Sequence, residues 1–318
     1  MKGRESRGAL DGRDPETGAT RPFLPLAAPM REGGLNVVCL AIVADTSATR
    51  ISADRRRIEP FRTPAPGELY ALSQTSFARL HALVEREQLA VVKTVADLRA
   101  ARGGPPAVIV TSEGADFLEG RIDRVDEAYE RHHLRQLQLN HYRVNELGDI
   151  QTEPPQNDGL TDFGAAVLKR CQQRGVVVDV AHASFAFVQR AAELATKPLV
   201  LSHTALVDRP RPRSRSIGPE HARLVASTGG VIGVWPSAGS FADLDAMAQG
   251  ARRLADLVGA EHVGFGSDML GFISPPVFTD YRQLPAYAQA LARAGFTRAE
   301  VGAVLGGNYL RVAAACFV

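Results

Sequence analysis

Residues 175–203, with the sequence GVVVDVAHASFAFVQRAAELATKPLVLSH, carry the clearest fold signal in this chain. Two apolar runs, Val176–Val180 and Pro198–Leu201, are typical of buried strands. Between them Ser184 opens a segment, Phe185 to Thr196, in which apolar residues recur at helical spacing. A strand, a helix and a second strand of this size predict a parallel β-α-β unit.

A histidine follows each of these two runs within a residue or two. His182 comes after the first run and His203 comes after the second. In parallel α/β folds, catalytic and binding residues gather at the carboxyl ends of the strands. The two imidazoles are therefore candidate ligands of one metal ion.

The alternation of strands and helices continues along the chain and predicts a parallel sheet with right-handed crossovers. We expect seven strands, near residues 37, 107, 135, 177, 199, 232 and 264. We expect helices over residues 67–87, 94–102, 121–132, 161–173, 185–196, 219–227, 241–258, 281–294, 298–305 and 308–316. A closed (β/α)8 barrel needs eight strands, and the deficit falls at the N-terminus. The predicted fold is α/β, a TIM-like (β/α)8 barrel with the first strand degenerate or missing.

The composition is ordinary for a soluble globular protein. The chain has 318 residues, of which 45% are hydrophobic and 23% charged, and its formal net charge is +2. Such a balance gives no reason to expect nucleic acid or a membrane as partner. We expect residues 1–30 to form a poorly ordered or degenerate segment and residues 31–318 to form a single barrel domain.

The cysteines and the N-terminus bear on the cellular compartment. Cys39, Cys171 and Cys316 are odd in number and contain no close pair, which argues against a disulfide framework. No apolar run reaches transmembrane length, and the first residues lack the apolar core of a signal peptide. We therefore expect a cytoplasmic protein.

Five residues far apart in the sequence share one property, which is that each follows a predicted strand within about three residues. They are Glu113, His141, His182, His203 and Asp268. On a barrel all five would surround one mouth. Glu113, His182 and His203 would form a two-histidine, one-carboxylate zinc site with an open position, where zinc lowers the pKa of a water ligand to about 7. Asp268 could then act on the proton of that water.

Each of these residues also has a structural explanation when it is taken alone. A histidine after a strand is often a hydrogen-bonded structural residue. Glu113 could be an acid favoured at a helix N-terminus, and Asp268 could cap the turn at residues 269–271. Their coincidence at one predicted mouth favours the metal site.

An arginine-rich segment, residues 209–215 with the sequence RPRPRSR, follows His203 after a short loop. It could be a solvated basic loop stiffened by proline. Alternatively, one guanidinium could bind a carboxylate in bidentate fashion. Spacing alone does not choose among the four arginines.

Eight segments of the chain form a recognisable set, which is REGGLNVVCLAIV (31–43), SEGADFLEG (112–120), HYRVNELGD (141–149), GLTDFGAAVLKR (159–170), VVVDVAHAS (176–184), PLVLSHT (198–204), HVGFGSDMLG (262–271) and GGNYLRV (306–312). In this order they resemble the membrane dipeptidase (renal dipeptidase) family of zinc peptidases, within the amidohydrolase-like barrels. The resemblance implies a metallodipeptidase with a dipeptide as its small-molecule substrate, and it allows a homodimer.

The resemblance also implies roles for individual residues. Two zinc ions would be bound, with Glu113 bridging them and with His182 and His203 holding the second ion. Asp268 would serve as the general acid/base. The substrate would be bound by two further residues, with His141 near the scissile carbonyl and Arg215, or as second choice Arg213, on the carboxylate.

One part of the family pattern is absent from this sequence. In the family the first strand ends in a His-x-Asp or His-x-His pair that binds the other zinc. The corresponding region, residues 10–23, contains no histidine, although Asp11, Asp14 and Glu16 could supply carboxylates. This leaves open a natural variant that binds one metal ion or none, and hence a catalytically impaired family member that acts as a binding protein. A separate alternative is a metal-dependent amidase or lactamase that acts on another substrate.

Overall fold

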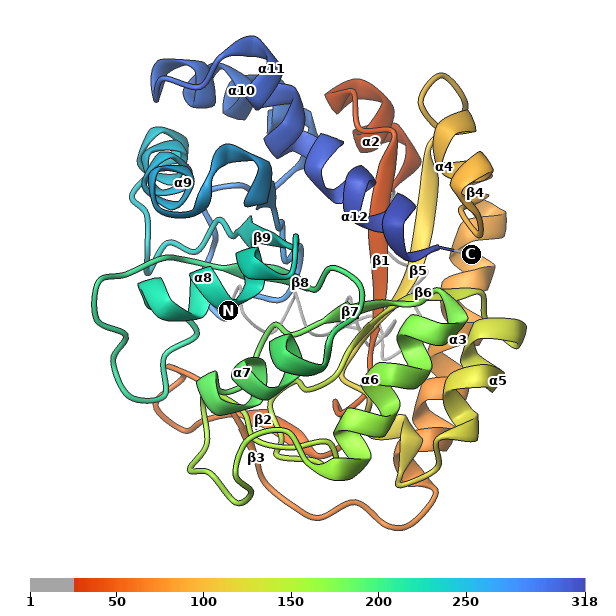
Figure 1. Cartoon of the computed structure of the whole chain (residues 1–318). Coiled ribbons are helices and arrows are strands. Elements are labelled where there is room, and N and C mark those ends of the chain that lie inside the picture. Colours follow the sequence, from red (N-terminus) through yellow and green to blue (C-terminus); the bar gives the residue numbers. More distant parts are fainter. Residues whose placement is uncertain (1–25, 318) are drawn as a thin grey trace.

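The computed structural model describes residues 26–317, in which a curled parallel sheet is surrounded by helices (Figure 1). The strands are β1 (Val37–Val43), β2 (Thr49–Ile51), β3 (Ile58–Pro60), β4 (Ala90–Val91), β5 (Ala107–Glu113), β6 (Leu134–Gln138), β7 (Val177–Asp179), β8 (Val200–Thr204), β9 (Val231–Val234) and β10 (Val263–Phe265). Apart from the antiparallel hairpin of β2 and β3, all of them belong to one sheet.

The sheet confirms the predicted fold. Its strands follow the order β1-β5-β6-β7-β8-β9-β10, each pair of neighbours is parallel, and β4 pairs with the start of β5. Within residues 26–317, no strand lies between β1 and β10, so the described sheet is a half-barrel that is open at that seam. The expectation that the first strand is degenerate or missing concerns residues 1–25, which lie outside the described part, and the predicted division at residues 30 and 31 stays a prediction.

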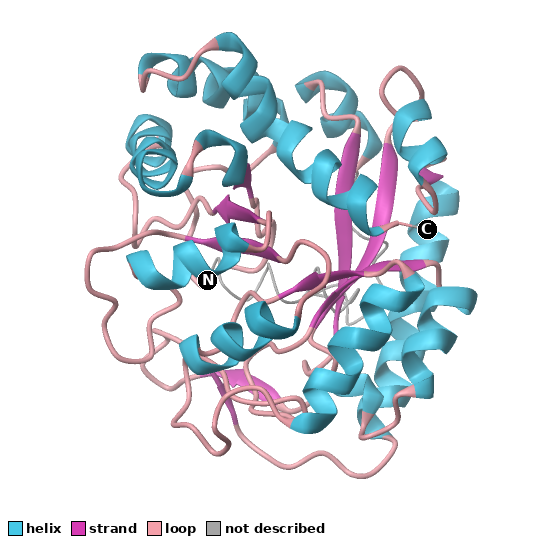
Figure 2. Cartoon of the chain, viewed as in Figure 1, coloured by secondary structure: helices cyan, strands magenta, loops and turns pink. Residues whose placement is uncertain are grey.

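Helices cover the outer side of the curled sheet (Figure 2). The α-helices are α2 (Ala27–Gly33), α3 (Glu68–Arg86), α4 (Val95–Ala100), α5 (Asp123–Arg131), α6 (Asp162–Arg174), α7 (Phe185–Leu194), α8 (Pro219–Ser227), α9 (Leu244–Val258), α10 (Leu284–Arg293), α11 (Arg298–Gly302) and α12 (Asn308–Cys316). Short turns of helix are η1 (Asp116–Leu118), η2 (Ala260–His262), η3 (Tyr281–Gln283) and η4 (Ala303–Gly307). Ser184 and Thr161 cap α7 and α6 through their side-chain oxygens.

Several element boundaries differ from the prediction. Helix α9 begins at Leu244 rather than Phe241, because Asp243 accepts a hydrogen bond from the amide of Ala246 and so caps the helix there. The predicted helix over 281–294 is divided into η3 and α10. The predicted helix over 298–305 is an α-helix only in α11, after which the chain continues as the π-helical turn η4. Helix α2 and the β2–β3 hairpin were not predicted.

The two ends of the barrel differ in chemistry. At the amino ends of the strands, α12 packs Val312 and Cys316 against the first residues of several strands, including Val177 and Val231. This apolar layer closes one end of the half-barrel. The carboxyl ends carry the polar residues that form the candidate site.

Two glycines allow the last strands to approach β8 closely. A Cβ atom added at Gly233 in β9, or at Gly266 just after β10, would lie 1.9 Å from the carbonyl oxygen of Ser202. No side chain fits at that distance, so both positions require glycine. The close approach brings the loop after β10 to the carboxyl end of β8, where His203 lies.

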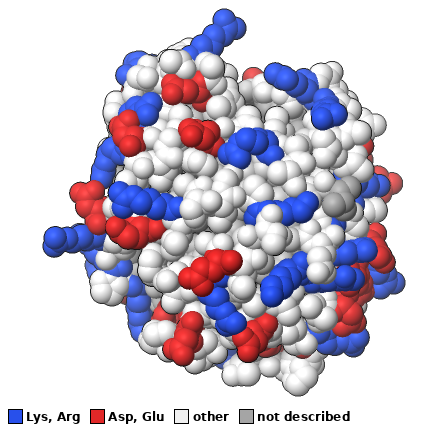
Figure 3. Space-filling view, in the orientation of Figure 1, with Lys and Arg blue, Asp and Glu red and all other residues white. Residues whose placement is uncertain are grey.

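Cationic and anionic side chains are interspersed over the face shown in Figure 3, in line with the formal net charge of +2. Among the helices that the structure describes, none combines the length and the apolar composition required to cross a bilayer.

Candidate metal centre and active site

The carboxyl ends of five strands bring the predicted site residues together. Glu113 is the last residue of β5, and His141, His182 and Asp268 lie in the loops after β6, β7 and β10. His203 lies inside β8 rather than after it, because the strand runs on to Thr204. The expectation that all five follow their strands was therefore wrong for His203 and for Glu113, which ends β5, although both side chains still reach the mouth.

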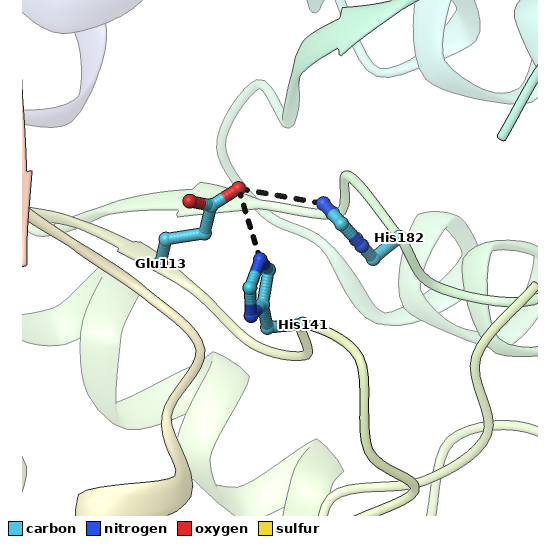
Figure 4. A group of neighbouring side chains, drawn as sticks. All are labelled: Glu113, His141 and His182. Atoms are coloured by element: carbon cyan, nitrogen blue, oxygen red, sulfur yellow. Dashed lines mark ion pairs between the residues drawn. The ribbon is translucent and has the colours of Figure 1, made fainter. Parts of the chain in front are cut away.

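One carboxylate oxygen forms the centre of the cluster (Figure 4). Oε1 of Glu113 lies 3.4 Å from Nε2 of His182, 3.4 Å from Nε2 of His203 and 3.6 Å from Nε2 of His141. Nε2 of His182 and Nε2 of His203 are 3.0 Å apart. Because zinc–nitrogen bonds measure about 2.0–2.1 Å, two imidazole ligands of a tetrahedral zinc are separated by about 3.3 Å. The spacing of the donor atoms therefore fits a shared metal ion.

The protonation of His182 and His203 suits metal binding. Burial, together with the nearby charge of Arg215, lowers the pKa of both imidazoles well below the ordinary value. Nδ1 of His203 lies 2.8 Å from Oγ of Ser202. If Nδ1 donates its proton there, Nε2 keeps the lone pair that a metal ion needs.

His141 differs from the other two histidines, because a carboxylate lies behind its ring. Oδ1 of Asp45 accepts a hydrogen bond from Nδ1 of His141 at 2.7 Å, and Oδ2 accepts one from the amide of Tyr142 at 3.1 Å. Burial by itself lowers the pKa of His141. The negative charges of Asp45 and Glu113 raise this pKa by more than burial lowers it, so that it is about 9. A protonated imidazole has no free lone pair, so Glu113, His182 and His203 are better suited than His141 to hold a metal ion.

Asp268 completes the rim of the cluster. Donor atoms of Asp268, Glu113 and His203 all lie within 4.8 Å of one another. Burial, and then the charge of Glu113, raise the pKa of Asp268 well above its ordinary value. Asp268 and His182 also have positive φ angles of 43° and 69°. Non-glycine residues rarely adopt this conformation, and it concentrates at functional sites.

Arg215 is the arginine of the RPRPRSR segment that enters the site. It is buried, and its guanidinium donates to the Gln151 side-chain oxygen and, at 3.5 Å, to the carbonyl oxygen of His203. Its Nε is buried without a hydrogen-bond partner in the described structure. Arg213 is exposed and has a φ angle of 58°. Because its guanidinium is buried and has an unpaired donor, Arg215 is better suited than Arg213 to bind a carboxylate.

The sequence reasoning missed four residues of this site. They are Asp45, Tyr142, Gln151 and Trp235. Asp45 could have been found, because it follows a predicted strand within about three residues, as Glu113 does. The ring of Tyr142 packs edge-on to His182 at 4.7 Å between centroids, and the aromatic contact of Trp235 with His203 depends on the fold.

Residues 27–316 match the family described as Membrane dipeptidase (Peptidase family M19). The chain belongs to the membrane dipeptidase family. The family resemblance inferred from the sequence motifs is thereby confirmed.

Individual relatives are more distant. The Dipeptidase aclJ of Aspergillus oryzae is 26% identical over 272 residues, which cover 80% of this chain and 64% of that protein. The metallo peptidase of Rhodobacter sphaeroides, liganded with a phosphinate mimic of the dipeptide L-Ala-D-Ala, has a TM-score of 0.80 at 20% identity, covering 99% of this chain and 95% of that one. The probable dipeptidase PvdM of Pseudomonas aeruginosa has a TM-score of 0.78 at 16% identity, covering 99% and 98%.

The structural similarities and the sequence similarities support different conclusions about this chain. The structural neighbours, at 20% identity or less, share the fold. The chain spans slightly less than two thirds of the length of the Aspergillus oryzae relative. Activity and substrate therefore have to be argued from the side chains of this chain.

Proposed function

We propose that this protein is a metal-dependent dipeptidase. The observation that carries the proposal is the convergence of two neutral imidazoles and one carboxylate, His182, His203 and Glu113, on one position at the carboxyl ends of the strands. Membership of a family of metallopeptidases supports it.

The donor set suits zinc, since two imidazole nitrogens and a carboxylate oxygen form catalytic zinc sites in other hydrolases. A zinc ion held there would polarise a carbonyl group and lower the pKa of water. We propose one such ion, held by Glu113, His182 and His203. A single ion agrees with the sequence, because no histidine precedes His81 and the family's first ligand pair is absent.

The remaining side chains would bind the substrate and move a proton. Arg215 would bind the C-terminal carboxylate of the dipeptide through its unpaired Nε donor. His141, held by Asp45, would donate from Nε2 to the oxygen of the scissile carbonyl. Asp268 would take a proton from the attacking water and give it to the leaving amine as the carbon–nitrogen bond breaks.

Metal analysis combined with a dipeptide panel tests this proposal. We expect the purified protein to bind zinc and to hydrolyse at least some dipeptides, and we expect the folded His182→Ala variant to lose both properties. His262→Ala is the matched control, because Nδ1 of His262 bonds to the carbonyl oxygen of Gly230 at the start of β9, away from the mouth. A parent protein that binds no metal and turns over no dipeptide would reject the proposal.

A non-catalytic binding protein is the second candidate, and the absent first ligand pair favours it. In that case zinc would bind without turnover of any dipeptide. Adding a strand that carries the His-x-Asp pair at the N-terminus should then create activity that the present chain lacks.

A further inference from the structure

The assignment of Arg215 to the substrate carboxylate leaves the other arginines of the RPRPRSR segment unexplained. Two of them, Arg211 and Arg213, line a cleft with a volume of about 870 Å³, which is the size of a ligand-binding cleft. Gln151 lines this cleft and also accepts the hydrogen bond of Arg215, so the cleft lies beside the metal centre. Neither Arg215 nor any of the proposed metal ligands lines it. We call it the side cleft.

Two loops and the start of α7 form the side cleft. The first loop covers residues 149–159 and the second covers residues 210–218. Nε2 of Gln151 in the first loop donates to the carbonyl oxygen of Ser216 in the second, at 3.2 Å. The amide of Ser184, which precedes α7, donates to a carbonyl oxygen of the first loop at 3.0 Å. Hydrogen bonds therefore join the three segments to one another.

Both loops are also stiff in themselves. The carboxylate of Asp149 accepts hydrogen bonds from three amides of its own loop, at 2.8, 3.0 and 3.1 Å. The second loop contains Pro210 and Pro212, which line the side cleft and whose rings fix the backbone φ angle. A ligand that enters a preformed cleft has little of the protein to order, so binding there loses little free energy to ordering.

The two loops bring opposite charges to the side cleft. Glu153 and Asp158 line it from the first loop, and Arg211 and Arg213 line it from the second. Within residues 26–317, none of these four side chains forms an ion pair or a hydrogen bond. Acids and bases that share a cleft without contacting each other leave room for a ligand that carries both charges.

Phe185 supplies an apolar surface in the same cleft. It is the first residue of α7 and is 46% exposed, although its ring contacts the buried His221 at 5.9 Å between centroids. Both residues line the side cleft. The exposed part of this ring is available to an apolar group of a ligand, and burial of the two surfaces against each other would stabilise the complex.

We propose that the side cleft is a second binding site, which takes a short peptide in its zwitterionic form. The C-terminal carboxylate would bind to Arg211 and Arg213, because a guanidinium pairs strongly with a carboxylate. The N-terminal ammonium group would face Glu153 and Asp158, and an apolar side chain would pack against Phe185. A ligand with a single charge would leave one loop unmatched, so charge complementarity favours the zwitterion. This site requires neither the metal ion nor the proposed catalysis.

Calorimetric titration of the folded His182→Ala variant tests the inference without hydrolysis of the probe at the proposed metal centre. The probe is the tripeptide Ala-Phe-Ala, and we expect saturable binding. N-acetyl-Ala-Phe-Ala lacks the ammonium group, and Ala-Phe-Ala amide lacks the carboxylate. Each should bind with a Kd at least about threefold higher, since each loses one set of ion pairs. No saturable binding, or an equal Kd for the three peptides, would overturn the inference.

Matched variants place the peptide in the side cleft rather than at Arg215. Arg211→Gln should raise the Kd of Ala-Phe-Ala by about threefold, whereas Arg209→Gln changes an exposed arginine of the same segment that does not line the cleft, and should leave it unchanged. Phe185→Ala should raise the Kd by about threefold to tenfold. Phe61→Ala is its control, because Phe61 is 45% exposed and lies outside the cleft. A Kd that is unaltered in either cleft variant, or that changes equally in its control, would overturn the inference.

Turnover of Ala-Phe by the zinc-loaded parent protein separates this inference from the proposed function. Turnover without saturable binding of Ala-Phe-Ala to His182→Ala would support the dipeptidase and reject the side cleft as a peptide site. Binding that depends on Arg211 and Phe185, without turnover of any dipeptide, would support the side cleft and reject the dipeptidase.

Discussion

Nε2 of His182 lies 3.0 Å from Nε2 of His203, and both atoms lie 3.4 Å from the same oxygen of Glu113. Two imidazoles whose pKa values are both lowered in this way stay neutral at pH 7, so each can offer the lone pair of Nε2 to one ion when its Nδ1 carries the proton. The parallel register of the sheet creates this arrangement, because β7 and β8 are neighbours and each delivers one histidine to the mouth.

Replacing Asp45 should damage catalysis more than substrate binding. Asp45→Asn weakens the hold on His141, so that Nε2 of the imidazole is no longer fixed toward the site. We expect kcat to fall by about 10–100-fold while KM changes little, as for other partners that orient an active-site group. Steady-state kinetics of the folded variant measure this. A rise in KM at unchanged kcat would contradict the positioning role.

Arg215 and Arg213 form a matched pair for testing carboxylate binding. Arg215→Lys keeps the positive charge but loses the planar fork, so we expect KM for dipeptides to rise by about tenfold or more. Arg213→Lys changes an exposed side chain and should leave KM within about twofold of the parent value. KM is measured for both variants with the same dipeptide. If the two substitutions change KM equally, Arg215 is not the residue that binds the carboxylate.

The stability of the protein should decrease in mild acid through His132. Burial, and then His81, lower the pKa of His132 from 6.5 to about 4. As the pH falls, the unfolded chain therefore binds this proton at a higher pH than the folded protein does. The stability that is present above about pH 6.5 is lost as the pH falls toward about 4. Urea unfolding at pH 7 and at pH 5 measures this loss.

His132→Phe is the variant that isolates this effect. It keeps a ring stacked on Phe77, where the centroids are 4.3 Å apart, and it removes the titrating group. The variant should lose less free energy of unfolding between pH 7 and pH 5 than the parent protein. Equal losses would show that His132 does not contribute to the pH dependence.

Gly266 should be far less tolerant of substitution than Gly302. Gly266→Ala places a Cβ atom 1.9 Å from the carbonyl oxygen of Ser202, so we expect a loss of about 1–3 kcal/mol in the free energy of unfolding. Gly302 has no atom within 4 Å of an added Cβ and lies in α11, so Gly302→Ala should be neutral or stabilising. Denaturant unfolding compares them, and equal stability would contradict the close approach at Ser202.

Much of the architecture could be predicted from the sequence, because buried parallel strands and amphipathic helices have distinct periodicities. Polar residues at strand ends therefore led to Glu113, His141, His182, His203 and Asp268. The contact between Trp235 and Phe272 could not be predicted in this way, since the two rings meet through the path of the loop after β10. The choice of Arg215 over Arg213 likewise rested on the family motif, and burial of the side chain is visible only in the fold.

The most direct test of the central claim is an anomalous diffraction measurement at the zinc edge on crystals of the zinc-loaded protein. We predict a peak about 2.0–2.1 Å from Nε2 of both His182 and His203, next to the carboxylate of Glu113. Zinc bound elsewhere with no peak at this position, or two imidazoles too far apart to share an ion, would contradict the account.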